Sequence, residues 1–172
     1  MTEETKAESN PDSMIVLDVN GSKHQISEVQ HSMTLADVLR DKLGLTGTKV
    51  ACDDGACGSC TVLIDDVPTL SCMTLAHTVI SKKITTIEAL KCGNKLHPIQ
   101  EAFIEERGFA CGYCTPGIIM TTKALLAKNP NPSEEVIKES LAGNICRCAI
   151  YEHIIDAAKA AAIKMQGSEC RC

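Results

Sequence analysis

Cysteine is the residue type with which this chain of 172 residues can do most chemistry, because it occurs eleven times. Eight of the eleven fall into two groups between Cys52 and Cys148. The segment Met1–Asp12 has no basic region and no apolar stretch, so we do not expect a secretory signal. Thiols stay reduced in the cytoplasm, and an odd number of cysteines does not suit a complete disulfide framework. We therefore expect a cytoplasmic protein whose cysteines bind metal.

The first group has the spacing C-x4-C-x2-C-x11-C. Its members are Cys52, Cys57, Cys60 and Cys72. The C-x4-C-x2-C run is typical of plant-type [2Fe–2S] ligation, in which three thiolates come from one loop and the fourth from another element. Gly55 and Gly58 allow the backbone to approach an inorganic anion closely. The run is not a zinc-finger spacing, so we predict an iron–sulfur site here.

The second group has the spacing C-x2-C-x31-C-x-C. Its members are Cys111, Cys114, Cys146 and Cys148. We expect these pairs at the ends of helices, where helix N-termini stabilise an anionic group. Four thiolates alone do not distinguish zinc from iron, since both metals accept four sulfur ligands. The spacing of this group therefore leaves both metals open.

The elements that must position these cysteines differ between the two halves of the chain. Alternating apolar residues and the Asn20-Gly21 turn dipeptide predict strands. Leucine and valine residues at helical spacing after Thr34 predict a helix that Gly44 ends. The strands are expected over 14–19, 22–26, 61–64 and 84–87. This order indicates a small α+β domain.

Helical patterns fill the second half. Pro116-Gly117 and Ser133 are typical helix starts. Helices are expected over 99–106, over 116–128, from Ser133 and over 152–164, which indicates a small bundle. We divide the chain into a disordered tail over 1–12, a first metal-binding domain over 13–90, a linker over 91–97, a helical metal-binding domain over 98–165 and a mobile tail over 166–172.

Composition excludes several classes of protein. Lys and Arg number 17 against 22 Asp and Glu, which gives a net charge of −5 and no basic stripe for nucleic acid. The longest apolar runs fall well short of a membrane span. A hydrophobic content of 44% excludes a wholly disordered chain. Because aromatic residues make up only 2%, we expect bound metal to help hold the fold together.

The motifs around the cysteines resemble those of the small iron–sulfur subunit of molybdenum hydroxylases, the xanthine oxidase family. The matching segments lie in order at family spacing over residues 14–163. They are KVACDDGACGSCTV (49–62), LSC (70–72), TIE (86–88), LHPIQEAF (96–103), CGYCTPG (111–117) and GNICRC (143–148) with Tyr151.

The resemblance implies an α+β fold, with an N-terminal β-grasp domain like that of plant-type ferredoxins and a C-terminal four-helix bundle. It implies two [2Fe–2S] clusters, the first on Cys52, Cys57, Cys60 and Cys72 and the second on Cys111, Cys114, Cys146 and Cys148. The second cluster would lie nearest molybdenum. The partners implied are a large molybdopterin-binding subunit, together with an FAD-binding medium subunit, in a heterotrimer that can dimerise. No catalytic residue or substrate site is expected on this chain.

The chain departs from the family pattern at two places. Ala110 stands where the family usually has a glutamine that contacts the pterin, so we expect no pterin contact from this residue. Ala149-Ile150 stands where Thr-Gly is usual. All eight expected ligands are present.

Two other functions remain open. A free-standing, ferredoxin-like electron carrier would not need the second domain, and a zinc-stapled interaction module would be colourless. Arg147, between two expected ligands, suits either tuning of the second cluster or pairing with an acid. Tyr113 and Tyr151 suit packing on the second cluster or ordinary core packing. The five histidines are expected to be surface or capping residues, Cys92 a free thiol, and Cys170 and Cys172 to have no function.

Overall fold

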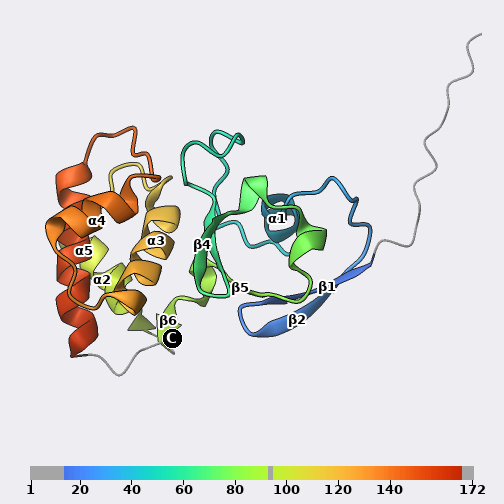
Figure 1. Cartoon of the computed structure of the whole chain (residues 1–172), viewed down its shortest axis with the longest axis horizontal. Coiled ribbons are helices and arrows are strands. Elements are labelled where there is room, and N and C mark those ends of the chain that lie inside the picture. Colours follow the sequence, from blue (N-terminus) through green and yellow to red (C-terminus); the bar gives the residue numbers. More distant parts are fainter. Residues whose placement is uncertain (1–13, 93–94, 168–172) are drawn as a thin grey trace, which may run out of the picture.

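A five-stranded mixed sheet forms the first half of the chain (Figure 1). The computed structural model describes residues 14–92 and 95–167, so the tail predicted over 1–12 and most of that over 166–172 lie outside the described residues. The strands are β1 (Ile15–Val19), β2 (Ser22–Ile26), β3 (Thr61–Ile64), β4 (Val67–Leu70) and β5 (Lys83–Thr85). They lie in the order β2-β1-β5-β3-β4, and only the β1–β5 pair is parallel.

Two tight turns set the hairpins of this sheet. Asn20 and Gly21 join β1 to β2 with φ values of 56° and 76°, and Asp65 and Asp66 join β3 to β4 with 48° and 64°. Two consecutive residues of positive φ match the twist of the flanking strands. The second hairpin was not predicted from the sequence, because β4 is an edge strand that contains Pro68.

The helix expected after Thr34 is present but changes geometry. Thr34 and Asp37 form a capping box at the start of α1 (Leu35–Asp37), with hydrogen bonds of 3.2 Å and 2.9 Å. The chain then continues as a π-helical turn, η1 (Val38–Lys42). Short 3-10 helices follow along the chain as η2 (Ser71–Met73), η3 (Ala76–Val79) and η4 (Ile87–Ala89).

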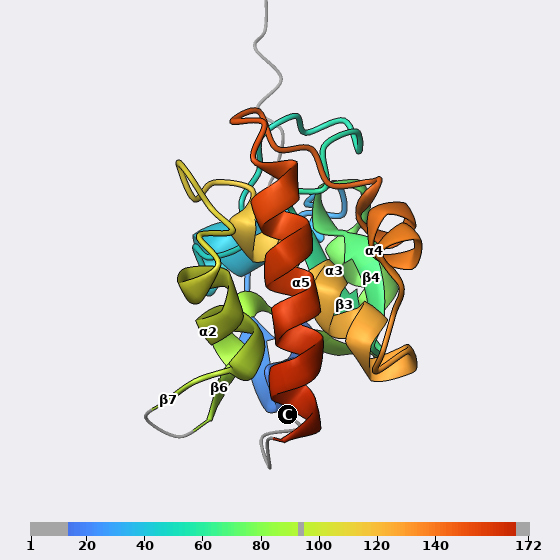
Figure 2. The same ribbon diagram turned by 90° about the vertical axis from the view of Figure 1, so that its left-hand side faces the viewer.

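Four helices make up the second half of the described chain, as expected. They are α2 (Pro98–Glu105), α3 (Thr115–Lys128), α4 (Glu134–Leu141) and α5 (Tyr151–Gln166). Figure 2 shows α5 lying across the front of this bundle, between α2 and α4. The segment predicted as a linker over 91–97 contains a small hairpin of β6 (Lys91–Cys92) and β7 (Lys95–Leu96). The α+β fold class is confirmed.

Strand β3 belongs to two hydrophobic cores at once. Val62 and Ile64 face the core that contains α1 and η1, whereas Leu63 is 1% exposed in the helical core. Successive strand residues point to opposite faces of a sheet, which explains the division. The helical bundle therefore packs directly on the sheet, through α3 (Figure 1).

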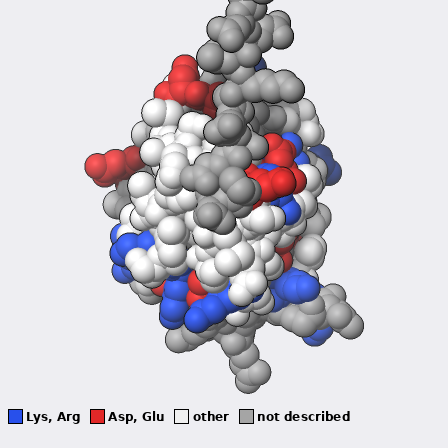
Figure 3. Space-filling model, turned by 90° about the vertical axis from the view of Figure 1, so that its right-hand side faces the viewer, with Lys and Arg blue, Asp and Glu red and all other residues white. Residues whose placement is uncertain are grey.

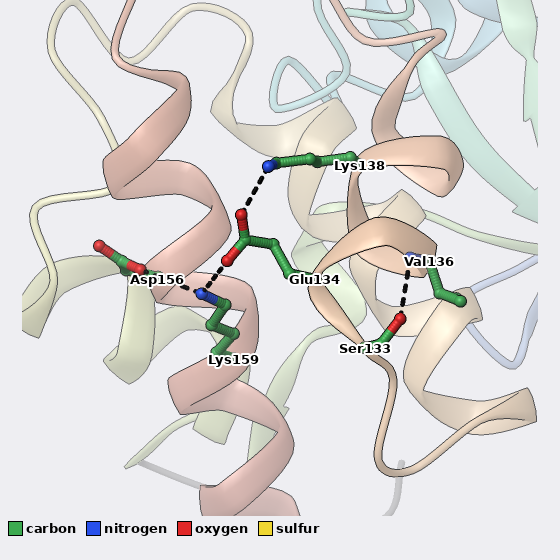
Figure 4. Close-up of polar contacts among 6 residues, drawn as sticks. All are labelled: Ser133, Glu134, Val136, Lys138, Asp156 and Lys159. Atoms are coloured by element: carbon green, nitrogen blue, oxygen red, sulfur yellow. Dashed lines mark hydrogen bonds and ion pairs between the residues drawn. The ribbon is translucent and has the colours of Figure 1, made fainter.

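Ion pairs join the helices at their surfaces. Glu134 on α4 accepts from Lys138 on the same helix at 2.5 Å and from Lys159 on α5 at 2.6 Å (Figure 4). Lys138 and Lys159 hold the pKa of the Glu134 carboxyl at about 2. Lys164 similarly connects α5 to Glu101 and Glu105 on α2. All these groups are partly exposed, so the pairs add little stability individually.

The surface of the sheet half that faces away from the helices has no large patch of a single charge. Figure 3 shows a broad uncharged area there, with acidic and basic groups around it, the acidic ones mainly above and the basic ones mainly below. Within the described residues, no helix is long and apolar enough to cross a membrane.

His97 is a buried cap at the start of α2. Its Nδ1 accepts the Ile99 N–H at 3.2 Å, so a neutral ring carries its proton on Nε2, which is buried without a partner among the described residues. Burial, followed by the charge of Lys123, lowers the pKa of His97 below its ordinary value. The capping role expected for a histidine is confirmed at this position.

The stability of the fold should depend on pH through His97. Because the pKa of His97 is lower in the folded chain than in the unfolded chain, the unfolded chain binds more protons just below pH 6.5. Stability is therefore full above that pH and falls as the pH drops toward the folded value. Replacement by asparagine (His97→Asn) keeps a capping acceptor without a titrating group. We expect thermal unfolding midpoints to fall more for the wild type than for His97→Asn between pH 7.5 and pH 5.5. Equal falls would contradict this role.

Candidate metal centres

The β3–β4 hairpin brings together two thiols of the first group. Cys60 immediately precedes β3 and Cys72 lies in η2 after β4, so the strand register places them side by side. The Ser71 N–H and hydroxyl both donate to the Cys60 carbonyl, at 3.3 Å and 2.7 Å. The two Sγ atoms lie 3.3 Å apart, and the residues are 2% and 5% exposed.

The loop before β3 brings Cys52 and Cys57 to the same place. Asp53, Gly55 and Gly58 all have positive φ, which turns the backbone around the thiols. Cys57 contacts the Cys52 thiol, and Cys72 interacts with Cys52 as well as with Cys60. The four predicted residues of the first group therefore lie near one another, and we call them the first cysteine site. Among the described residues, no three of the Cys, His, Asp and Glu side chains are gathered closely enough to hold a metal ion as they stand.

The surroundings of the first cysteine site shift the pKa values of two of its thiols in opposite directions. Burial opposes ionisation of Cys57, but the backbone N–H and hydroxyl of Ser59, together with Cys52, lower the pKa of its thiol to about 7. Burial and the neighbouring Cys60 raise the pKa of the Cys72 thiol to about 12. A bound cation removes the proton from such a thiol outright, so metal binding here would release protons.

The cysteines of the second group also lie near one another, beside the starts of α3 and α5. Cys114 is the N-cap residue of α3, and Cys146 and Cys148 lie in the loop that leads to α5. The thiols pair as Cys111 with Cys148 and Cys114 with Cys146. Figure 1 shows the loops that carry both groups at the same upper edge of the molecule. We call this set the second cysteine site.

Burial differs within the second cysteine site. Cys146 is buried and Cys114 half-buried, whereas Cys111 and Cys148 are exposed. Burial and Cys146 raise the pKa of the Cys114 thiol to about 12, whereas the Tyr113 N–H and then Cys148 lower the pKa of Cys111. The Tyr151 hydroxyl accepts the Cys146 N–H at 2.9 Å.

The two cysteine sites meet along a seam of backbone contacts. The Ile145 N–H donates to the Cys57 carbonyl at 2.9 Å, and the Asn144 side-chain amide donates to the Gly58 carbonyl at 3.0 Å. A Cβ atom on Gly117 would lie 2.3 Å from that same Gly58 carbonyl. No local pattern in the sequence indicated this seam, because its hydrogen-bonded partners lie more than 80 residues apart, 86 in the case of Asn144.

The remaining residues singled out in the sequence take different places. Arg147 is exposed and forms no ion pair with a described residue, so pairing with an acid is not seen there. Tyr113 and Tyr151 are 46% and 44% exposed rather than core residues. The His31 and His77 rings contact each other, with 4.4 Å between centroids.

Three cysteines fall outside the two groups that the spacing defines. The side chains of Cys92, Cys170 and Cys172 lie outside the described residues, so the expectations of a free thiol and of two cysteines without function stay predictions.

Both halves of the chain match known domain families. Residues 17–77 match the 2Fe-2S iron-sulfur cluster binding domain, and residues 86–159 match a [2Fe-2S] binding domain. The two matches together contain both cysteine sites.

Several known proteins are similar to the chain over most of its length. It is 43% identical to the nicotine 6-hydroxylase small subunit of Paenarthrobacter nicotinovorans, over 83% of this chain and 86% of the relative. It is 42% identical to the aldehyde oxidoreductase iron-sulfur-binding subunit PaoA of Escherichia coli, over 86% of this chain and 71% of the relative. The structure of quinoline 2-oxidoreductase from Pseudomonas putida 86 superposes with a TM-score of 0.86 at 43% identity, covering 91% of this chain and 97% of that chain.

The seam predicts different effects for two glycine substitutions. Alanine is normally the better helix residue, but Gly117→Ala would press a methyl group on the Gly58 carbonyl, and overpacking of this kind costs about 1–3 kcal/mol. Gly143→Ala meets no atom within 4 Å. We expect denaturant unfolding to show a clear loss of stability for Gly117→Ala only. Equal stability of the two variants would contradict the tight seam.

Proposed function

The chain belongs to the iron–sulfur small subunits of the molybdenum hydroxylases, and we propose that it carries single electrons between two partner subunits. The donor is the molybdopterin centre of a large subunit, and the acceptor is a flavin subunit or another oxidant. The observation that carries the proposal is the hydrogen bond from Ile145 to Cys57, because it joins the two cysteine sites directly.

We further propose that eight thiols hold two [2Fe–2S] groups. The first set is Cys52, Cys57, Cys60 and Cys72, and the second is Cys111, Cys114, Cys146 and Cys148. The grouping of the thiols in pairs supports this assignment, since each iron of such a group takes two protein ligands. The domain families that match the two halves also favour iron over zinc, because both are described as binding a [2Fe–2S] group.

The residues around the thiols suit an anionic group. When bound, a [2Fe–2S] group accepts or gives up one electron at a time. Gly55 has a φ of 80° and directs its backbone N–H to Cys72, and the Ser59 N–H is directed to Cys57. The N-terminus of α3 begins at Cys114, where a helix dipole favours negative charge. Backbone donors of both sites can therefore compensate the charge of the bound group.

The names of the relatives support the proposal that this chain works with partner subunits. Several relatives are subunits of named complexes, such as the gamma subunit of caffeine dehydrogenase from a Pseudomonas strain and the beta subunit of the 6-hydroxypseudooxynicotine dehydrogenase complex from Paenarthrobacter nicotinovorans. We propose a large molybdopterin-binding subunit, together with an FAD-binding medium subunit, in a heterotrimer that can dimerise. The substrate site belongs to the large subunit in this proposal.

Metal analysis of the native complex tests the proposed function. We expect gentle anaerobic capture of the chain from its source to bring down a large partner, with about four iron atoms and one molybdenum per chain. Flavin in the same complex would identify the acceptor side. Iron without molybdenum or a partner would overturn the assignment to a complex and favour a free-standing two-cluster carrier. A colourless protein without iron would contradict both.

A cysteine substitution tests the division of the ligands. Cys72→Ser should remove the iron of the first site only, so iron should fall from about four to about two atoms per chain. Cys92→Ser is the matched control, because Cys92 belongs to neither set, and it should keep all its iron. Iron and sulfide analysis with visible absorption measures both variants. Loss of iron from Cys92→Ser, or full iron in Cys72→Ser, would contradict the assignment.

A further inference from the structure

Tyr113 connects the two cysteine sites through its side chain. It lies between Cys111 and Cys114 in the second site, yet its hydroxyl donates to the Val50 carbonyl at 2.7 Å. Val50 lies 63 residues earlier and two residues before Cys52 of the first site. The contact therefore crosses from one cysteine loop to the other.

The backbone directs Tyr113 toward this partner. Gly112, with a φ of 82°, turns the chain just before it. The Tyr113 N–H is directed to the Cys111 thiol while its hydroxyl reaches Val50. One residue thus donates from the backbone to its own site and from the side chain to the other.

Val50, which accepts this hydrogen bond, lies against the first cysteine site. The Val50 side chain packs against a small buried cluster made of Ala36, Cys60 and Cys72. A movement of the Val50 backbone would therefore displace the side chains that pack against Cys60 and Cys72, the paired thiols of the first site.

Tyr113 supplies a second point of attachment between the loops. The seam hydrogen bonds of Asn144 and Ile145 come from the segment beside Cys146. The bond of Tyr113 comes from the other cysteine pair of the second site. Two attachments on different segments resist rotation of one loop against the other, which a single attachment would allow.

We propose that Tyr113 is a positioning residue that holds the two cysteine sites at a fixed separation and thereby sets the rate of electron exchange between them. The inference rests on the proposed function. One electron leaves one site and arrives at the other, with no bond made or broken. Because the rate of tunnelling falls steeply with distance, a looser seam slows the exchange while each site keeps its own ligands.

Replacement by phenylalanine (Tyr113→Phe) tests the proposal, since it removes only the hydroxyl. In the iron-loaded full chain, we expect the Ile145 amide to exchange its hydrogen about two- to tenfold faster, the factor expected for loss of one ordinary hydrogen bond. We also expect weaker magnetic interaction between the two reduced sites by electron paramagnetic resonance, and slower electron exchange after flash reduction. The iron content should equal that of the wild type.

Thr78→Val is the matched control. Its hydroxyl also donates to a backbone carbonyl at 2.7 Å, that of Leu75, but this bond is local and does not cross the seam. Unchanged Ile145 exchange in Tyr113→Phe, or equal acceleration in both variants, would overturn the proposal. Loss of iron from Tyr113→Phe would also overturn it, because Tyr113 would then hold a ligand loop rather than the seam. The iron content of the wild-type chain tests the proposed function, independently of the role proposed for Tyr113.

Discussion

The arrangement of both cysteine sites depends on the space around two backbone carbonyl groups, those of Cys57 and Gly58. They accept the Ile145 amide and the Asn144 side chain, and no side chain larger than hydrogen fits beside them at Gly117. These carbonyls belong to the loop that carries the first site, so the second site is built against the backbone of the first. The separation of the sites therefore depends on close contact at these backbone carbonyls, to which the Asn144 and Tyr113 side chains add hydrogen bonds.

Strand β3 provides the support behind that contact. Its residues alternate between two cores, with Leu63 in the helical core and Val62 in the core under the sheet. With few aromatic residues available, the two cores are small and rely on Leu, Ile, Val and Ala. Sharing one strand allows each half to bury more apolar surface than it could alone. The two halves therefore differ in fold but stabilise each other.

Local patterns predicted much of this structure from the sequence. Helix starts such as Ser133 and the Asn20-Gly21 turn depend on neighbouring residues, and they identified the helices and the first hairpin. The cysteine spacings predicted two ligand sets, which stay proposals. Strand β4 was missed because Pro68 and its exposed edge remove the usual alternation. The seam was missed because it arises from close approach of distant segments. The two groups of cysteines follow from the spacing, whereas the contact between the sites required the fold.

The unequal chain lengths between paired thiols have a consequence for how the protein is made. Cys60 and Cys72 are separated by eleven residues that form their own hairpin, whereas Cys114 and Cys146 are separated by 31 residues that include α3 and α4. Closing the longer loop costs about 1 kcal/mol more in chain entropy. Of the helices inside it, α3 packs directly on β3. During synthesis on the ribosome, all four thiols of the first group leave before any thiol of the second, so the β3–β4 hairpin can form before the helix that packs on it.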